Sequence, residues 1–134
     1  MIQEAKQSAT RTACGTAITP MPSGEAALRP TMGIGMLGMG VVGSGLARVL
    51  RDREADLAAS AGASLSIEAI AVRDAEKRRD DDLPLNLVTA DVDAVLNNPE
   101  VDIVVEVIGG VDDALDYVRR AIRGGKHVVT ANKD

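Results

Sequence analysis

Aromatic residues are almost absent from this sequence, in which Tyr117 is the only one and Phe and Trp do not occur. The core must therefore be built from Val, Ile, Leu and Ala, which favours an α/β sandwich over an aromatic-rich all-β domain. The chain therefore lacks the aromatic side chains on which nucleic-acid-binding proteins stack bases. Its net charge of −5 also argues against the basic surface that such proteins use. We therefore expect no nucleic-acid partner.

Cysteine and long apolar runs are also scarce. A single cysteine, Cys14, excludes an internal disulfide framework and a multi-cysteine zinc site, so we expect no metal. No apolar run approaches the ~20 residues that span a bilayer, so we expect no membrane partner. Together these absences predict a soluble protein of the reducing cytoplasm.

The first 31 residues differ in composition from the rest of the chain. They mix Ser, Thr, Ala, Gly and Pro without a hydrophobic period, and such a segment buries too little apolar surface to offset the entropy of ordering. We predict a flexible extension over residues 1–31 and a folded domain over residues 32–134. Apolar, largely β-branched runs predict strands in that domain at 32–37, 66–72, 86–89, 101–108 and 127–130.

Helical patterns lie between the predicted strands, including a short one around residues 91–98. Two longer helices are indicated by apolar residues that we expect to line one helix face: Val42, Leu46, Val49 and Leu50 in the first, and Leu115, Val118 and Ile122 in the second. Asp112 or Asp113 can cap the second helix, and Gly124-Gly125 ends it. This alternation predicts an α/β fold with a doubly wound parallel sheet of about five strands.

The sequence GMGVVG directly follows the first predicted strand and begins the first helix. In a GxGxxG motif in this context, Gly38 permits a tight turn, Gly40 lets a pyrophosphate approach the backbone, and Gly43 lets the helix pack close to the sheet. Backbone N–H groups here, including those of Val41 and Val42, would face the phosphate charge together with the helix dipole. The motif predicts a Rossmann-type dinucleotide-binding domain, although glycines that serve only tight packing remain an alternative.

The end of the second predicted strand decides between NAD and NADP in such domains. An acidic residue there binds the ribose hydroxyls, whereas an arginine accommodates a 2′-phosphate. This chain has both, Arg73 and then Asp74, and Lys77, Arg78 and Arg79 follow. The cluster favours NADP, with NAD tolerated; a solvated basic turn is the alternative interpretation.

Two further segments end at the same predicted sheet edge, where ligands of open parallel sheets bind. Gly109-Gly110 follows the fourth strand and lets the backbone pass close to a ring or phosphate, although a plain strand-to-helix turn is equally consistent. The fifth strand ends at Thr130, and Asn132 and Lys133 follow. An ammonium group at Lys133 could hold a substrate oxygen or assist proton transfer; a solvated lysine is the alternative.

Two ionisable residues in the predicted strands are less informative. Glu106 is unusual in an apolar strand, and a buried carboxylate there needs partners or a raised pKa, unless it points to solvent at the strand end. His127 begins the last strand, where we interpret it as structural.

The stretches GMLGMGVVGSGL, IAVRD, VDIVVEVIGG and GKHVVTANKD together closely resemble the amino-terminal domain of homoserine dehydrogenases, over residues 32–134. Related oxidoreductases of sugars tend to carry Glu-Lys-Pro where this chain has Asn-Lys-Asp. Two features depart from the family: the long extension, and Asp134 where a small apolar residue commonly follows the lysine.

The resemblance implies an NAD(P)-dependent interconversion of L-homoserine and L-aspartate 4-semialdehyde, a small-molecule step toward threonine, methionine and isoleucine. It implies that the residue matching Arg73 approaches the 2′-phosphate and that Lys133 lies by nicotinamide and substrate, and it extends the cofactor-binding set to Gly109 and Thr130. The family's second catalytic lysine and acidic substrate ligands belong to a later domain, as does its dimer contact. We therefore interpret the chain as a fragment that binds NADP(H) weakly, turns over little, and need not be a homodimer.

Two other functions stay open from sequence. One is another Rossmann oxidoreductase, such as an aspartate dehydrogenase-like enzyme. A substrate screen with homoserine and aspartate would distinguish it from a homoserine dehydrogenase. A non-catalytic nucleotide-sensing module predicts tight, selective dinucleotide binding instead.

Overall fold

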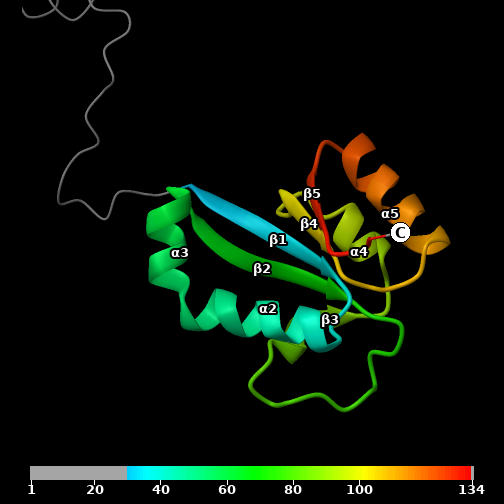
Figure 1. The fold of residues 1–134 in the computed structure, drawn as a ribbon, viewed down its shortest axis with the longest axis horizontal. Coiled ribbons are helices and arrows are strands. Elements are labelled where there is room, and N and C mark those ends of the chain that lie inside the picture. The colour runs from blue at the N-terminus through cyan, green and yellow to red at the C-terminus, as the bar shows by residue number, and fades with distance from the viewer. Residues whose placement is uncertain (1–29, 134) are drawn as a thin grey trace, which may run out of the picture.

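The structure, a computed structural model, describes residues 30–133. The predictions for Cys14, for residues 1–29 of the extension and for Asp134 lie outside the described residues. Within the described part, five parallel strands form one sheet in the order β3-β2-β1-β4-β5 (Figure 1). The strands are β1 (Thr31–Leu37), β2 (Ser64–Ala71), β3 (Val88–Thr89), β4 (Ile103–Glu106) and β5 (His127–Thr130). The predicted doubly wound α/β fold is confirmed.

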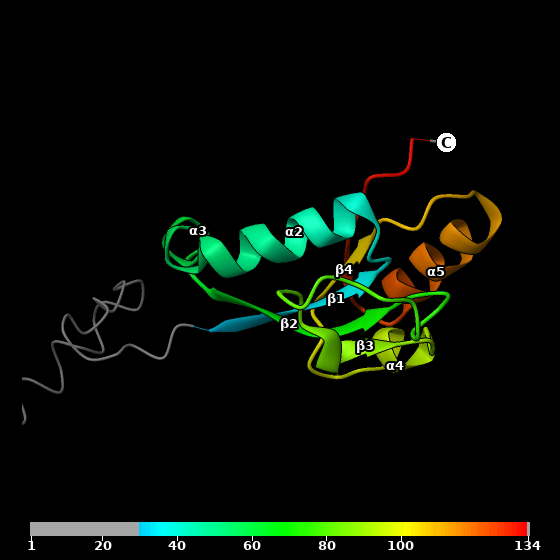
Figure 2. The same ribbon diagram turned by 90° about the horizontal axis from the view of Figure 1, so that it is seen from below.

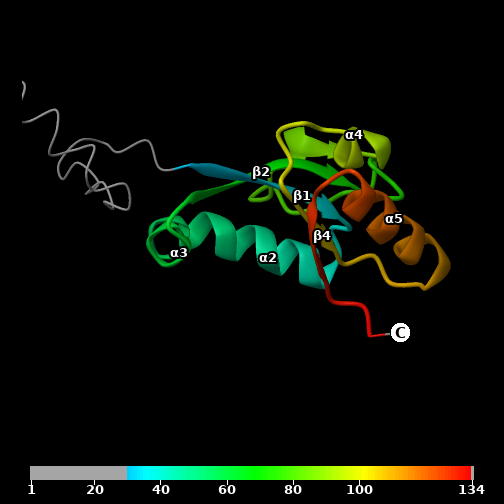
Figure 3. The same ribbon diagram turned by 90° about the horizontal axis from the view of Figure 1, so that it is seen from above.

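Helices cover both faces of this sheet. The helices are α2 (Val41–Asp52), α3 (Glu54–Ala61), α4 (Asp93–Leu96) and α5 (Asp112–Arg123). Two opposite views, from below and from above, place α2 and α3 over one face and α4 and α5 over the other (Figure 2, Figure 3). Within residues 30–133, none of the helices combines the length and apolar character that crossing a bilayer requires.

Each sheet face carries its own aliphatic core. Met36 and Ile70 are fully buried in the cluster on the α2 side, and Val95 and Val104 are fully buried in the cluster on the α5 side. Successive residues of a strand point to opposite faces, so a strand covered by helices on both faces is apolar throughout. This explains the nearly unbroken apolar runs that the sequence shows at β1 and β4.

The sheet order reverses direction at β1. The chain moves from β1 to β2 and β3 on one side, and β4 and β5 lie on the other side. In open parallel sheets, the crevice beyond the carboxyl ends of the strands at such a reversal is where ligands bind. The fold therefore places the expected ligand site at the carboxyl ends of β1, β2 and β4.

Two predicted strands are shorter than expected. Of the run at 86–89, only Val88–Thr89 pairs with β2, because residues Leu85–Leu87 form a 3₁₀ turn, η1, after Pro84. Of the run at 101–108, only Ile103–Glu106 is assigned as strand. Hydrogen bonds from the N–H of Asp102 to the carbonyl of Gly33 and from the N–H of Val107 to the carbonyl of Leu37 extend that pairing by one residue at each end.

The buried face of α2 matches the predicted one only in part: Leu50 is buried and Leu46 packs against the core, as expected. Gly43, Ala47 and Leu50 are buried, whereas Val42 is 58% exposed and Val49 is also exposed. The helix packs so close to the end of β1 that its contact face needs small residues. Apolar spacing alone therefore located the helix but identified only part of its contact face, Leu46 and Leu50.

Helix α5 shows the same departure. Its buried residues are Ala114 and Ala121, whereas Ile122 is 59% exposed and Leu115 is also exposed. Alanines again provide the close contact with the sheet, and the larger aliphatic side chains flank it.

The predicted cap of α5 is wrong, but its predicted end is correct. The N-cap residue is Val111, and no side chain caps the helix; Asp112 and Asp113 lie inside the first turn, where they face the positive end of the helix dipole. The helix ends at Gly124, and Gly125 then takes a positive φ of 79°.

Candidate functional site

A tight turn joins β1 to α2 at Gly38. This residue has a φ of +106°, and its N–H donates to the carbonyl of Ala71 at 2.8 Å. A Cβ atom at Gly38 would lie 2.8 Å from the carbonyl oxygen of Val107. Both the dihedral angle and the neighbouring backbone require glycine, so the turn predicted at this position is present.

The first turn of α2 lies against this glycine turn. A Cβ atom at Gly43 would lie 2.5 Å from the carbonyl oxygen of Gly38, whereas nothing lies within 4 Å of a Cβ at Gly40. Gly40 is the N-cap of α2; no side chain caps the helix, and its first turn has no acidic residue. The N–H groups at this end, next to the exposed Val41, therefore present a positive dipole end to an approaching anion.

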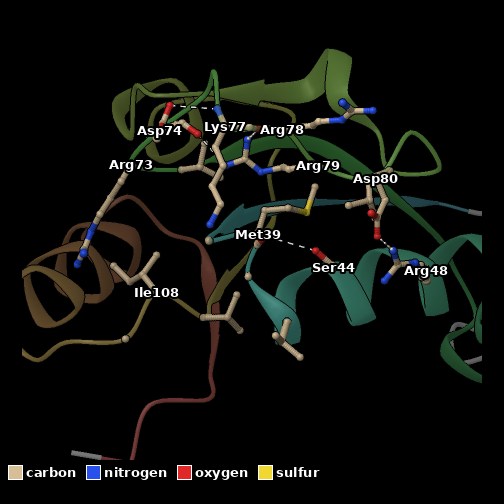
Figure 4. A pocket seen from close by; sticks show the side chains of 17 residues that line it. Met39, Ser44, Arg48, Arg73, Asp74, Lys77, Arg78, Arg79, Asp80 and Ile108 are labelled. Carbon is tan, nitrogen blue, oxygen red and sulfur yellow. Dashed lines mark hydrogen bonds and ion pairs between the residues drawn. The ribbon is translucent and has the colours of Figure 1, made fainter.

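A cleft of about 830 Å³ opens beyond the carboxyl ends of β1, β2 and β4 (Figure 4). Three segments surround it: the glycine turn with the start of α2, the loop after β2, and the loop after β4. Its lining consists of Gly38, Met39, Gly40, Val41, Ser44, Arg48, Val72, Arg73, Asp74, Lys77, Arg78, Arg79, Asp80, Leu83, Val107, Ile108 and Gly109. Among the described residues, no cluster of His, Cys, Asp and Glu side chains is arranged to hold a metal ion.

The cleft gathers part of the set of residues singled out from sequence. Those that line it are Gly38, Gly40, Val41, Arg73 and Gly109. Those outside its lining are Val42, Gly43, Thr130 and Lys133. Gly43 lies beneath the turn, Val42 is exposed on α2, and the other two lie at or just beyond the end of β5. Their contacts with a ligand stay predictions.

The loop after β2 is held by its own polar side chains. Arg79 donates to the carbonyl oxygens of Asp74 and Lys77, both at 2.8 Å. The Asp74 carboxylate accepts the N–H groups of Glu76 at 3.0 Å and of Lys77 at 3.1 Å. Arg79 and one carboxylate oxygen of Asp74 are therefore committed to the shape of the loop.

The other cations of this loop are available to a ligand. Within residues 30–133, the side chains of Arg73, Lys77 and Arg78 have no hydrogen-bond or ion-pair partner, and all three line the cleft. Figure 4 shows Lys77 extending toward Met39, while Arg73 points away from Lys77. The end of β2 thus provides a cationic rim.

An ionic latch, defined as Arg48, Arg51, Asp80 and Asp82, joins α2 to the far end of the same loop. Arg48 donates to Asp82 at 2.9 Å and to Asp80 at 2.5 Å, and Arg51 donates to the Asp82 carbonyl at 2.6 Å. The hydrogen bond from Arg48 lowers the pKa of Asp82. Sequence reasoning did not identify this latch, because its partners lie more than 30 positions apart; the opposite charges of helix and loop were the available signal.

The latch should make stability depend on pH. Because the pKa of Asp82 is lowered in the folded state, its contribution is complete above the ordinary aspartate value of about 3.9 and is lost as pH falls through the lowered pKa. Asp82→Asn should therefore lower the urea unfolding midpoint at neutral pH, and the difference from the unmodified chain should shrink as the pH falls below about 4.

The matched control for this prediction is Asp81→Asn, since Asp81 is exposed and has no hydrogen-bond or ion-pair partner within the described residues. It should leave the midpoint nearly unchanged at each pH, and added salt should weaken only the Asp82 effect. Equal midpoints for the two variants across the pH range would contradict a stabilising latch.

The ends of β4 and β5 adjoin the cleft. Glu106 is buried rather than directed to solvent, and it has hydrogen-bond partners. The Asn132 side chain donates to the carbonyl of Gly110 at 2.7 Å, so the last segment contacts the loop after β4 at the sheet edge where the sequence placed both. Lys133 follows and is exposed, whereas His127 begins β5 at the opposite edge of the sheet.

Comparison with known families agrees with this architecture. Residues 38–134 match the family model described as "Homoserine dehydrogenase, NAD binding domain". Among curated proteins, the chain is 45% identical to a homoserine dehydrogenase of Bacillus subtilis over 101 residues, which is 75% of this chain and 23% of that protein. It is 42% identical to one of Pseudomonas aeruginosa over 100 residues, again 75% of this chain and 23% of that protein.

Solved structures give the same relationship. A homoserine dehydrogenase of S. aureus at pH 7.0 matches with a TM-score of 0.72 and 36% identity, covering 78% of this chain and 26% of that one. One from Thiobacillus denitrificans matches with a TM-score of 0.70 and 41% identity, covering 77% and 24%. The chain thus spans about a quarter of the length of these relatives.

Proposed function

Because this chain belongs to the homoserine dehydrogenase family, whose NAD-binding domain it matches, we propose that its cleft binds NADP(H), with NAD as the weaker ligand. The observation that carries the proposal is the open approach to Gly40 at the uncapped start of α2. A pyrophosphate there accepts hydrogen bonds from the N–H groups of Val41 and Val42 and faces the helix dipole. No Cβ obstructs that approach.

The adenosine half then extends toward the end of β2. Arg73, Lys77 and Arg78 provide charge for a 2′-phosphate, and their side chains have no competing partner within the described residues. The second carboxylate oxygen of Asp74 can accept a ribose hydroxyl, so NAD should also bind. Discrimination between the two cofactors therefore rests on this loop.

The nicotinamide half extends toward the ends of β4 and β5, where Gly109, Thr130 and Lys133 lie. When bound, the cofactor supplies or accepts the hydride. The Lys133 ammonium holds the substrate oxygen and assists its proton transfer. In the homoserine–aspartate 4-semialdehyde interconversion that we propose for the whole enzyme, this chain contributes cofactor binding and one catalytic lysine.

Titration calorimetry of the 134-residue chain with NADP⁺ and with NAD⁺ tests the proposal. We expect saturable one-site binding of both, tighter for NADP⁺, with the preference declining as salt screens the cationic rim. Lack of binding by either dinucleotide at millimolar concentration would contradict a cofactor role, and tighter binding of NAD⁺ would contradict the assigned preference.

A further inference from the structure

Glu106 is the buried charged side chain of this fold. It ends β4 and is 1% exposed, and no other charged or polar side chain within residues 30–133 is classed with it as buried. Its Oε1 accepts the N–H of Ile108 at 2.9 Å, and its Oε2 accepts the hydroxyl of Thr130 at 2.5 Å. The carboxylate lies in an apolar strand, where its desolvation is costly, and both of its oxygens accept hydrogen bonds.

These hydrogen bonds extend to both loops at the carboxyl edge. The N–H of Asn132 donates to the Thr130 hydroxyl at 3.0 Å, and the Asn132 side chain donates to the Gly110 carbonyl at 2.7 Å. Glu106 is thereby linked to the loop after β4 directly through Ile108 and to the segment after β5 through Thr130. The two segments are also linked to each other.

The sheet does not need this network for its own pairing. The backbones of β4 and β5 already pair along their whole length, from Ile103 opposite His127 to Glu106 opposite Thr130. One further hydrogen bond, from the N–H of Ala131 to the Glu106 carbonyl, extends this pairing. An apolar residue at position 106 would serve packing without burying a charge. The carboxylate additionally fixes the position of the two segments that follow these strands. One of them contains two glycines with positive φ.

We propose that Glu106 is a positioning residue that acts through Ile108, Thr130 and Asn132 to fix the two walls of the subsite for the nicotinamide half. The inference rests on the proposed function. A doubly wound fold binds the two halves of a dinucleotide on opposite sides of the reversal at β1, so the half remote from the end of β2 meets these walls. Lys133 is the next residue in the chain after Asn132.

The test compares NADP⁺ with 2′,5′-ADP, which carries the adenosine half and its phosphates but no nicotinamide. Glu106→Gln keeps the side-chain shape but cannot accept both hydrogen bonds. It should weaken NADP⁺ binding about tenfold, the scale of one lost hydrogen bond to a charged group, and change 2′,5′-ADP binding less than about twofold. Glu68→Gln, the same substitution in β2, is the matched control and should change neither.

Two further measurements keep the result interpretable. Amide hydrogen exchange should accelerate in Glu106→Gln at residues 108–110 and 131–132, but not in β1. Should Glu106→Gln fail to fold, Asn132→Ala removes the link to Gly110 while Glu106 keeps both of its hydrogen bonds, and it should show the same selective loss for NADP⁺.

The outcomes separate this inference from the proposed function. If the unmodified chain binds neither ligand, both fail. If it binds both ligands and the variants lose them equally, or lose neither, the cofactor role stands and the positioning role of Glu106 is overturned.

Discussion

Gly40→Ala should abolish dinucleotide binding and leave the fold intact. Gly40 has an ordinary φ of −79°, and nothing lies within 4 Å of the added Cβ, so alanine is accommodated in the free chain. In the proposed complex that Cβ would block the approach of the pyrophosphate and separate it from the N–H donors of α2. Loss of two such bonds to a charged group corresponds to a weakening of about a hundredfold or more in titration calorimetry.

Two other glycines of the same helix provide the comparison. Gly45 lies within α2 and also has nothing near its Cβ position, so Gly45→Ala should raise the free energy of unfolding by about 0.5–1 kcal/mol and leave binding unchanged. Gly43→Ala places a Cβ 2.5 Å from the Gly38 carbonyl and should destabilise the fold by roughly 1–3 kcal/mol.

Comparing these variants distinguishes two roles of glycine in this motif: leaving room for the ligand, and allowing the helix to pack against the turn. Urea unfolding measures the stability of each variant and calorimetry measures its affinity for NADP⁺. If Gly40→Ala bound as tightly as Gly45→Ala, the pyrophosphate could not lie against Gly40. If Gly40→Ala were as unstable as Gly43→Ala, the glycine would serve packing alone, which is the alternative that the sequence left open.

Local sequence patterns were sufficient for the strands and their order along the chain. The bounds of β5 match its HVVT run, and the β-branched run around β4 is buried on both faces as such composition predicts. The contact faces of α2 and α5 were predicted less well. Periodicity finds large apolar residues, whereas a helix that packs close to a sheet places Gly and Ala at the contact, as at Gly43 and Ala114.

The polar contacts of the site were less accessible to sequence reasoning, for a different reason. Arg48 and Asp82 are 34 positions apart, and Thr130 and Glu106 are 24 apart. Each pairing exists because the sheet order brings separate segments together, and no local pattern contains that information. The glycine motif could be recognised because all of its residues lie within six consecutive positions, 38–43. The position of Arg73 in the cleft lining could be predicted because the second strand lies beside the first, so its end lies close to that motif.

Arg73→Ala should reduce the preference for NADP⁺ over NAD⁺ and leave the fold unchanged. Arg73 lines the cleft and its side chain has no partner within the described residues, so its removal costs no intramolecular bond. A lost charge-assisted contact to a 2′-phosphate weakens NADP⁺ by roughly 10- to 100-fold, whereas NAD⁺ lacks that phosphate and should change by less than about threefold. Paired titrations with the two cofactors measure the ratio.

Arg119→Ala is the charge-matched control for Arg73→Ala, because it removes one positive charge from the exposed surface of α5, outside the cleft. It should leave the ratio of the two affinities unchanged, which excludes a general effect of net charge. Arg79→Ala is expected to differ from both: since Arg79 holds the loop through the carbonyls of Asp74 and Lys77, its loss should weaken both cofactors. An unchanged ratio in Arg73→Ala would remove Arg73 from the 2′-phosphate site and leave Lys77, which extends toward Met39, as the cation to test next (Figure 4).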